Sequence, residues 1–425
     1  MNQQRIIQSI LIALLLLPVL LTAQKAATPT VVPDAAPVDT FNYIAGTMVF
    51  DSAYHFTDQS LLMEGSGQVL ALGSSMIKCA LAPNHFAPEH LAALSKGYVN
   101  TEPNIQSDTQ LAQQTEYKKL FNMPFNSYIM WTYAFSTVDK IFPLHGPIKQ
   151  EVLDSEYKEI YDLTKYLLTT YNGTGKSFYL GNWEGDWHLL EGVPGRSDPA
   201  LKRKIDPFPD SPAAMASWLN TRQHAIEDAR RDTPHRNVAV WFYVEANLVQ
   251  KSIKENRVSM AHDVIPLVNP DFVSYSAYDS TDKDKDLHHD LPIALDYLQS
   301  KLKPKPGLPE KRVFIGEFGA PAMHYTAQEQ DARVRDVIAT AIKWGTPFVL
   351  YWEFYNNELE PDGTQRGFWL IDDKRVMQPA YFTYKSYYRD ARAYVATFTK
   401  ENKRKPTDQE FQAFAVKWFT SPVKQ

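Results

Sequence analysis

The chain of 425 residues contains a single cysteine, Cys79, so no intramolecular disulfide can form. Cys79 lies in the apolar run "SMIKCALA" and is interpreted as a small buried hydrophobe. The sequence has no HExxH, no paired CxxC and no comparable spacing, so we expect no metal and no cofactor. It also lacks an excess of positive charge: the formal net charge is −5. Without a basic field, nucleic acid is excluded as the expected partner.

The N-terminus is the one long apolar run of the chain. It has one arginine, an apolar stretch from Ile6 to Leu21 broken by Pro18, and a small-residue site near Ala23. This pattern predicts a signal peptide over residues 1–23 and therefore a secreted or periplasmic protein. An uncleaved membrane anchor is the alternative, although the run is short for a span. Residues 24–40 are rich in Pro and Ala and are predicted to be a linker, and we expect a monomer without a membrane span after processing.

Short apolar runs alternate with amphipathic helical stretches along the rest of the chain. The predicted strands are 43–50, 75–81, 127–135, 177–183, 237–245, 271–278, 312–318 and 347–354. The predicted helices are 57–73, 108–121, 154–171, 211–231, 259–268, 291–302, 326–345 and 378–398. Most strands lack clean alternation, as strands buried on both faces do. Strand then helix, eight times, predicts a (β/α)₈ TIM barrel over residues 41–397.

A doubly wound fold is the alternative to the barrel, but it normally has a glycine-rich phosphate turn after its first strand. The stretch "VFDSAYHFTD" has none. Residues 398–425 are left as a short C-terminal helical extension. The long segments 82–108, 136–150 and 184–210 follow predicted strands two, three and four, at the face where barrel active sites are built.

Four glutamates fall at the C-terminal ends of predicted strands: Glu184, Glu245, Glu317 and Glu353. That end of a barrel carries the reaction, so these residues are candidates for catalysis. Hydrolysis of a glycosidic bond needs one carboxyl group held protonated and a second held ionised as nucleophile or base. A retaining reaction requires the two carboxyl groups to be about 5–5.5 Å apart. Strands four and seven both point their ends into the central pocket, which favours Glu184 and Glu317 as the pair.

The glutamate ending strand four, the glutamate in "VFIGEFG", the tyrosine in "SYSAYD" and the tryptophan in "LYWEF" together resemble the clan A glycoside hydrolases. These are retaining (β/α)₈ enzymes, and the resemblance covers nearly the whole mature chain. It implies that Glu184 is the acid/base and Glu317 the nucleophile. It further implies that Tyr278 is a hydrogen-bond partner of the nucleophile and that Trp352 is the floor beneath the sugar.

The chain departs from the clan pattern at three positions. An asparagine commonly stands immediately before the acid/base, whereas Asn182 here stands two positions before it. Ser276 occupies the position of a histidine in strand six, and Lys78 is the candidate for the basic residue of strand two. We expect Asn182 and Lys78 to contribute to substrate binding, and no family within the clan is assigned.

The remaining candidates surround these residues. Trp183 and Trp187 flank Glu184, where aromatic neighbours raise a carboxyl pKa, and they offer faces for sugar rings. Asp186 is interpreted as a substrate hydrogen-bonder or a loop cap rather than a second catalytic carboxylate. Glu245 is either a catalytic or substrate-binding residue or the partner of Lys78, with the last interpretation favoured. Glu353 is interpreted as structural, because alternation turns it away from the pocket if Trp352 points in.

These observations together predict an exported retaining glycoside hydrolase that cleaves a poly- or oligosaccharide with two glutamates. Two alternatives remain open. The first is a barrel that binds carbohydrate with little or no turnover, which the departures from the clan pattern favour. The second is a transglycosidase, which uses the same covalent intermediate but passes it to a sugar.

Overall fold

The computed structural model describes residues 38–82, 98, 104–195, 198 and 204–422. The predicted signal peptide and nearly all of the predicted linker lie outside these residues. Within the described part of the chain, no helix is long and apolar enough to cross a membrane.

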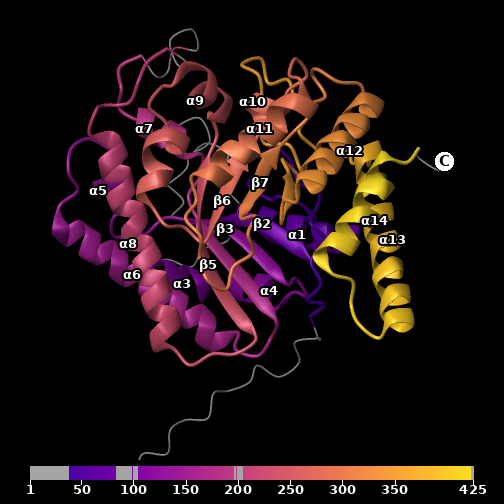
Figure 1. Ribbon diagram of the computed structural model, residues 1–425, viewed down its shortest axis with the longest axis horizontal. Helices are drawn as coiled ribbons and strands as arrows, with labels where there is room; N and C mark the ends of the chain where they lie inside the picture. The colour runs from indigo at the N-terminus through magenta and orange to yellow at the C-terminus, as the bar shows by residue number, and fades with distance from the viewer. Residues whose placement is uncertain (1–37, 83–97, 99–103, 196–197, 199–203, 423–425) are drawn as a thin grey trace, which may run out of the picture. The chain divides into compact units, whose positions relative to one another are not determined.

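Eight parallel strands form one sheet in the order β1-β8-β7-β6-β5-β4-β3-β2. Between the two ends of this order, the Val49 amide donates to the Lys78 carbonyl (2.9 Å), and Met48 and Lys78 form a parallel bridge. The sheet therefore closes on itself as a barrel, which confirms the predicted fold (Figure 1). The strands are β1 Ala45–Thr47, β2 Met76–Leu81, β3 Ser127–Thr132, β4 Lys176–Gly181, β5 Val238–Ala246, β6 Phe272–Ser276, β7 Val313–Phe318 and β8 Val349–Tyr351.

Helices follow the strands and cover the outside of the barrel (Figure 1). They are α1 Leu61–Leu72, α3 Asp108–Ala112, α4 Thr115–Asn122, α5 Val138–Ile141, α6 Gln150–Thr170, α7 Gly185–Leu190, α8 Ser211–Asp232, α9 Val249–Glu255, α10 Tyr278–Thr281, α11 Leu287–Ser300, α12 Ala327–Trp344, α13 Pro379–Asn402 and α14 Asp408–Thr420. The expected helix over 259–268 is instead a π-helix, Met260–Val264, and a 3₁₀ turn, Ile265–Leu267, while α9 lies upstream of it. Pro266 lacks the N–H that a continuous α-helix would need there.

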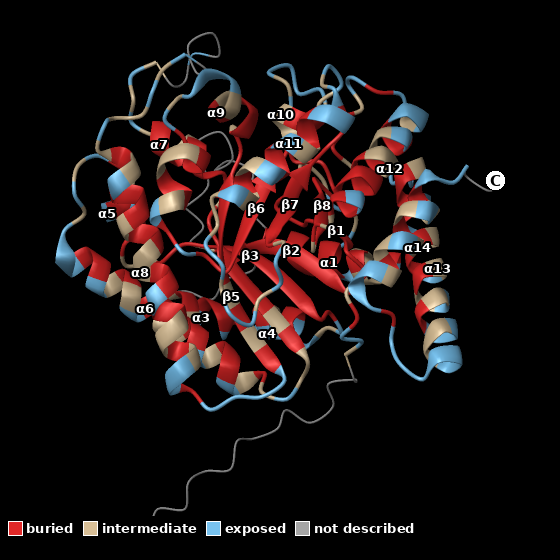
Figure 2. Cartoon of the chain, in the orientation of Figure 1, coloured by how far each residue is buried: buried red, intermediate tan, exposed pale blue. Residues whose placement is uncertain are grey.

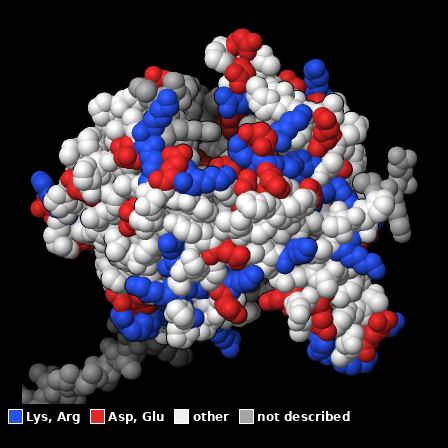
Figure 3. Space-filling view, turned by 45° about the horizontal axis from the view of Figure 1, so that its top comes forward, with Lys and Arg blue, Asp and Glu red and all other residues white. Residues whose placement is uncertain are grey.

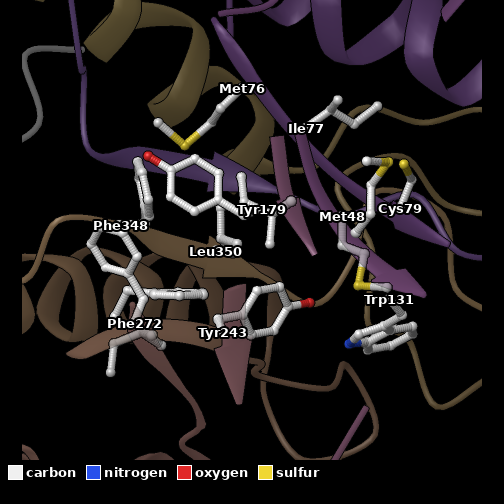
Figure 4. Close-up of a cluster of buried hydrophobic side chains, with 14 of the residues drawn as sticks. Met48, Met76, Ile77, Cys79, Trp131, Tyr179, Tyr243, Phe272, Phe348 and Leu350 are labelled. Carbon is white, nitrogen blue, oxygen red and sulfur yellow. The ribbon is translucent and has the colours of Figure 1, made fainter. Parts of the chain in front are cut away.

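Large apolar side chains fill the inside of the barrel. Figure 4 shows Tyr179, Phe348 and Leu350 packed beside Phe272 and Tyr243, and the ring centroids of Tyr179 and Phe348 are 5.1 Å apart. Figure 2 shows the strands buried, whereas the outer faces of the helices are exposed. This difference explains why the strands are apolar throughout while the helices are amphipathic.

The C-terminal part packs against the barrel through the last two helices. Helix α13 continues to Asn402, past the expected boundary at residue 397, and α14 follows it. The rings of Tyr387 and Phe419 lie 4.5 Å apart, and Arg335 of α12 donates to the carbonyls of Phe419 and Ser421. The extension therefore packs against α12 and α13 on the outside of the barrel.

Candidate active site

Glu317 lies in β7, and both of its carboxylate oxygens are held by other side chains. Lys78 Nζ lies 3.0 Å from Oε1, and the Tyr278 hydroxyl donates to Oε2 (3.1 Å). The register between β6 and β7 shifts between Tyr275 and Ser276, and Ser276 pairs with Glu317 across this irregularity. Such irregularities re-aim side chains at barrel rims. Tyr278 itself starts α10, two residues after β6 ends, so it is not a strand residue as expected.

Glu245 lies in β5, is completely buried, and accepts four hydrogen bonds. Lys78 Nζ (2.9 Å) and Ser274 Oγ (2.6 Å) donate to Oε2, while Trp131 Nε1 (3.2 Å) and the amide of Glu184 (3.0 Å) donate to Oε1. The interpretation of Glu245 as the partner of Lys78 is confirmed. Lys78 is also completely buried, and its ammonium group lies 4.4 Å from the centroid of the Trp131 ring.

Gly316 leaves the space that this cluster occupies. A Cβ atom at position 316 would lie 1.8 Å from Ser274 Oγ and 2.8 Å from Glu245 Oε2. The Gly316 carbonyl also accepts from Lys78 Nζ (3.0 Å). This glycine therefore makes room for protein side chains.

Glu184 follows β4 by three residues and is the N-terminal flanking residue of α7. Its side chain is 7% exposed and hydrogen-bonds to Trp187, and no lysine or arginine is paired with it in the described residues. Trp187 and Glu184 both line the cleft. The predicted acid therefore meets the cleft without a direct cationic partner, whereas Glu317 has one.

The electrostatics of the two glutamates follow from this difference. Burial raises the pKa of Glu184 well above its usual range, and the charges of Glu317 and Glu245 raise it further. Burial also raises the pKa of Glu317, to about 7, although Lys78 and the Tyr278 hydrogen bond act in the opposite direction. Burial by itself lowers the pKa of Lys78, but Glu245 and Glu317 outweigh it, so the pKa is raised. Glu184 is thus the carboxyl group that retains its proton.

Asp186 and Asn182 hold the backbone around Glu184. The Asp186 carboxylate accepts the amides of Asn247 (2.9 Å), Leu248 (3.2 Å) and Met260 (2.8 Å), which matches the interpretation as a loop cap. Asn182 is completely buried and donates to the carbonyls of Trp183 (3.0 Å) and Glu245 (3.3 Å).

The expectation that Asn182, Lys78 and Glu245 bind substrate directly is therefore corrected. Each has no exposed surface, and its polar atoms form hydrogen bonds with neighbouring groups of the protein. Their polar atoms instead contact other groups of the protein around Glu184 and Glu317.

The predicted aromatic residues divide into two groups. Trp187 and Tyr278 line the cleft. Trp352 immediately follows β8, is 5% exposed, and packs against Phe50 and Trp131, with ring centroids 6.3 and 6.1 Å away. Trp183 is half-buried and meets the His188 ring edge-on. The roles of Trp183 and Trp352 as sugar platforms stay predictions.

Glu353 and the histidine beside Trp187 have structural contacts. Glu353 is completely buried, and its Oε1 accepts the amide of Asn357 (3.1 Å), in agreement with the structural interpretation. His188 pairs with the Tyr133 hydroxyl (2.8 Å). Among the described residues, no group of three or more histidine, cysteine or acidic side chains is arranged to hold a metal ion.

A cleft of about 950 Å³ opens at this end of the barrel. Figure 3 shows a hollow on this face with acidic and basic side chains mixed along its edge. The cleft is lined by Glu184, Trp187, Asn247, Leu248, Tyr278, Asp279, Asp282, Lys283, Asp284, Lys285, Pro321, Met323, His324, Tyr325, Glu358, Glu360, Arg366 and Phe368. Its size is within the range of clefts that bind small organic molecules.

Sequence reasoning missed the part of the cleft that follows β8. Glu358 accepts from Trp352 Nε1 (3.0 Å) and from Arg366 (2.9 Å), and Arg366 also pairs with Glu360 (2.7 Å). The segment between β8 and α13 is long and follows a barrel strand, which is the signal that would have indicated it.

No protein-family model and no curated protein matches the sequence. Solved structures do match. A GH5_18 protein from Streptomyces cattleya, in complex with Manβ1-4GlcNAc, has a TM-score of 0.53 and 14% identity, with 82% of this chain and 81% of that chain covered. A family 5 xyloglucanase from Paenibacillus pabuli has a TM-score of 0.50 and 15% identity, with 82% and 98% covered.

The chain spans 64% of the length of a further match, a family 39 glycoside hydrolase from Bacteroides cellulosilyticus, at 11% identity and a TM-score of 0.48. At such identities the likeness concerns the fold. The two matches with TM-scores of 0.53 and 0.50 therefore show a shared fold, in agreement with the (β/α)₈ barrel described above.

Proposed function

We propose that this protein is an exported retaining glycoside hydrolase that acts on a poly- or oligosaccharide. One observation carries the proposal. Two buried glutamates stand at the ends of β4 and β7, and only Glu317 is paired directly with a cation, while burial raises the pKa of Glu184 well above its usual range. This asymmetry is what a double-displacement reaction requires of an acid and a nucleophile.

In the first step, the Glu317 carboxylate attacks the anomeric carbon and the bond to the leaving oxygen breaks. Glu184 donates its proton to that oxygen, so the leaving sugar departs as a neutral alcohol. The product is a glycosyl ester on Glu317. The Tyr278 hydroxyl and the Lys78 ammonium group, which contact separate Glu317 oxygens, orient the carboxylate for attack.

In the second step, Glu184, now ionised, takes a proton from water, and the water oxygen attacks the anomeric carbon. The ester bond to Glu317 breaks and the carboxylate is restored beside Lys78. The anomeric configuration is inverted twice and so retained.

Activity on a defined panel tests this proposal. The panel contains activated aryl β-glycosides, Manβ1-4GlcNAc, xyloglucan, and plant, fungal and bacterial polysaccharides. The wild-type protein should release sugar, while Glu317→Gln and Glu184→Gln should lose about 10³-fold or more of the activity on unactivated substrates. Glu310→Gln, at an exposed glutamate, is the matched control and should keep full activity.

Proton NMR of the product in the first minutes reports its anomeric configuration, and an inverted product contradicts the retaining mechanism. Equal activity of Glu317→Gln and wild type contradicts the assignment of the nucleophile. Binding of a glycan on the panel without any turnover favours the binding-protein alternative. Export is tested separately by cell fractionation and by N-terminal sequencing, which should find the mature chain starting after residue 23.

A further inference from the structure

Glu245 contacts the backbone of Glu184 directly and shares Lys78 with Glu317. Through Oε1 it accepts the backbone amide of Glu184 (3.0 Å). Through Oε2 it accepts Lys78 Nζ (2.9 Å), whose other carboxylate contact is Glu317 (3.0 Å). A single carboxyl group in β5 therefore links the residue after β4 to the residue in β7.

We propose that Glu245 is a positioning residue that holds the backbone of Glu184 and keeps Lys78 beside Glu317, an inference that rests on the proposed function. It does not touch the substrate, since it is completely buried. Its effect on catalysis passes through the Glu184 backbone and through the Lys78 ammonium group.

The hydrogen bonds around Glu245 match an ionised carboxylate. All four of its partners are donors: Lys78 Nζ, Ser274 Oγ, Trp131 Nε1 and the Glu184 amide. An ionised carboxylate can accept four such bonds, whereas a carboxamide carries two N–H groups that would face donors here. Glutamine at position 245 therefore keeps the shape of the side chain but cannot satisfy the same partners.

The residues around Glu245 make its charge matter to both catalytic groups. The negative charge of Glu245 raises the pKa of Glu184 and of Glu317, and it raises that of Lys78. Tyr133 and Tyr243 also face it, but burial raises their pKa values well above 10, so they stay neutral.

Three further groups also face this cluster. Tyr278 contacts Glu317, while Glu353 lies within electrostatic range of Glu317 and Cys79 within range of Tyr243. Burial raises the pKa of Cys79 to about 12 and raises those of Tyr278 and Glu353 well above their usual ranges. None of the three supplies a positive charge in place of Lys78.

Removing the charge of Glu245 should move the pH profile of activity to lower pH. Glu245→Gln removes one negative charge, so Glu317 becomes the one carboxylate of the described residues that contacts Lys78. The pKa values of Glu317 and Glu184 should both fall. Because the nucleophile must be ionised and the acid protonated, both limbs of the kcat/KM profile should move to lower pH, by about one pH unit. The two limbs belong to the coupled pair rather than to one residue each.

Three variants separate this role from a general loss of structure. Glu245→Gln should lower kcat with little change in KM and shift both limbs. Glu245→Asp should bring the limbs back toward wild type, since it restores the charge. Glu156→Gln removes another buried carboxylate, paired with Arg222 (2.8 Å), and should leave the limbs in place. Unshifted limbs in an active, folded Glu245→Gln protein overturn the inference.

A second measurement does not need turnover. Carbon-13 NMR of protein labelled at the glutamate carboxyl carbon follows Glu184 and Glu317 directly, with the signals assigned from Glu184→Gln and Glu317→Gln. Both titrations should move to lower pH in Glu245→Gln and stay unchanged in Glu156→Gln. Unmoved titrations overturn the inference even if the protein is inactive, and activity of the wild-type protein decides the proposed function independently.

Discussion

Replacing Lys78 by methionine removes the cation that Glu245 and Glu317 share. Methionine is close in length and volume, so the main change is the loss of charge and hydrogen bonds rather than a cavity. Lys78 is completely buried and contacts Glu245 (2.9 Å), Glu317 (3.0 Å) and the Gly316 carbonyl (3.0 Å). In Lys78→Met two carboxylates remain in the same enclosed space without a counter-charge.

The expected loss of stability is about 3–5 kcal/mol at pH 8, which is the usual cost of leaving a buried charge uncompensated. The loss should shrink at lower pH. Without Lys78 the Glu317 pKa rises above the value of about 7 in the wild type, while the unfolded chain titrates near 4.3. Between these two pKa values the folded variant therefore binds one more proton than the unfolded chain. Over that interval its free energy of unfolding falls by about 1.4 kcal/mol for each pH unit of increase.

Urea unfolding followed by tryptophan fluorescence at pH 6 and pH 8 measures both quantities. Lys78 remains charged in the wild type at both pH values, because its pKa is raised. Lys158→Met, which removes an exposed lysine paired with Asp162 (2.5 Å), is the control and should change the unfolding free energy by less than about 1 kcal/mol. Lys78→Met/Glu245→Gln should recover part of the loss. A Lys78→Met cost below 1 kcal/mol that is equal at both pH values would refute the reasoning.

Three further predictions concern neighbouring residues. Tyr278→Phe removes the hydrogen bond that lowers the pKa of Glu317. The acidic limb of the kcat/KM profile should therefore move to higher pH, and activity should fall about tenfold. A limb that moves to lower pH contradicts this prediction. Glu184→Gln should stabilise the protein at pH 8 by about 1 kcal/mol but not at pH 4, measured by urea unfolding. The reason is that a carboxyl group whose folded pKa is raised destabilises the fold once pH exceeds its unfolded value; equal effects at both pH values would argue against it. Asp186→Ala should cost about 3 kcal/mol, because three backbone amides lose their acceptor, and thermal unfolding with no loss would exclude the loop-cap role.

The barrel itself followed from the sequence, because strand and helix formation depends on patterns within a few residues. Each of the eight predicted strands overlaps an observed one, and the predicted range 312–318 differs from β7 Val313–Phe318 by one residue. Local patterns also placed Glu184 and Glu317 near the ends of β4 and β7. Two exceptions were the segment 259–268, where the helical pattern continues through Pro266, and Tyr278, which starts α10 instead of ending a strand.

The cluster beneath the cleft depended on tertiary structure. Lys78 and Glu245 are 167 positions apart along the chain, and Lys78 and Glu317 are 239 positions apart. Only closure of the barrel brings β2, β5 and β7 around one centre. Whether a polar residue at a strand end faces substrate or another side chain depends on these distant partners, which the sequence around Asn182 and Lys78 does not contain. The sequence by itself determined the fold and the placement of Glu184 and Glu317 near the ends of β4 and β7, through local pattern. Only the tertiary structure decided which of them has a cation beside it, because that contact joins residues far apart in the chain.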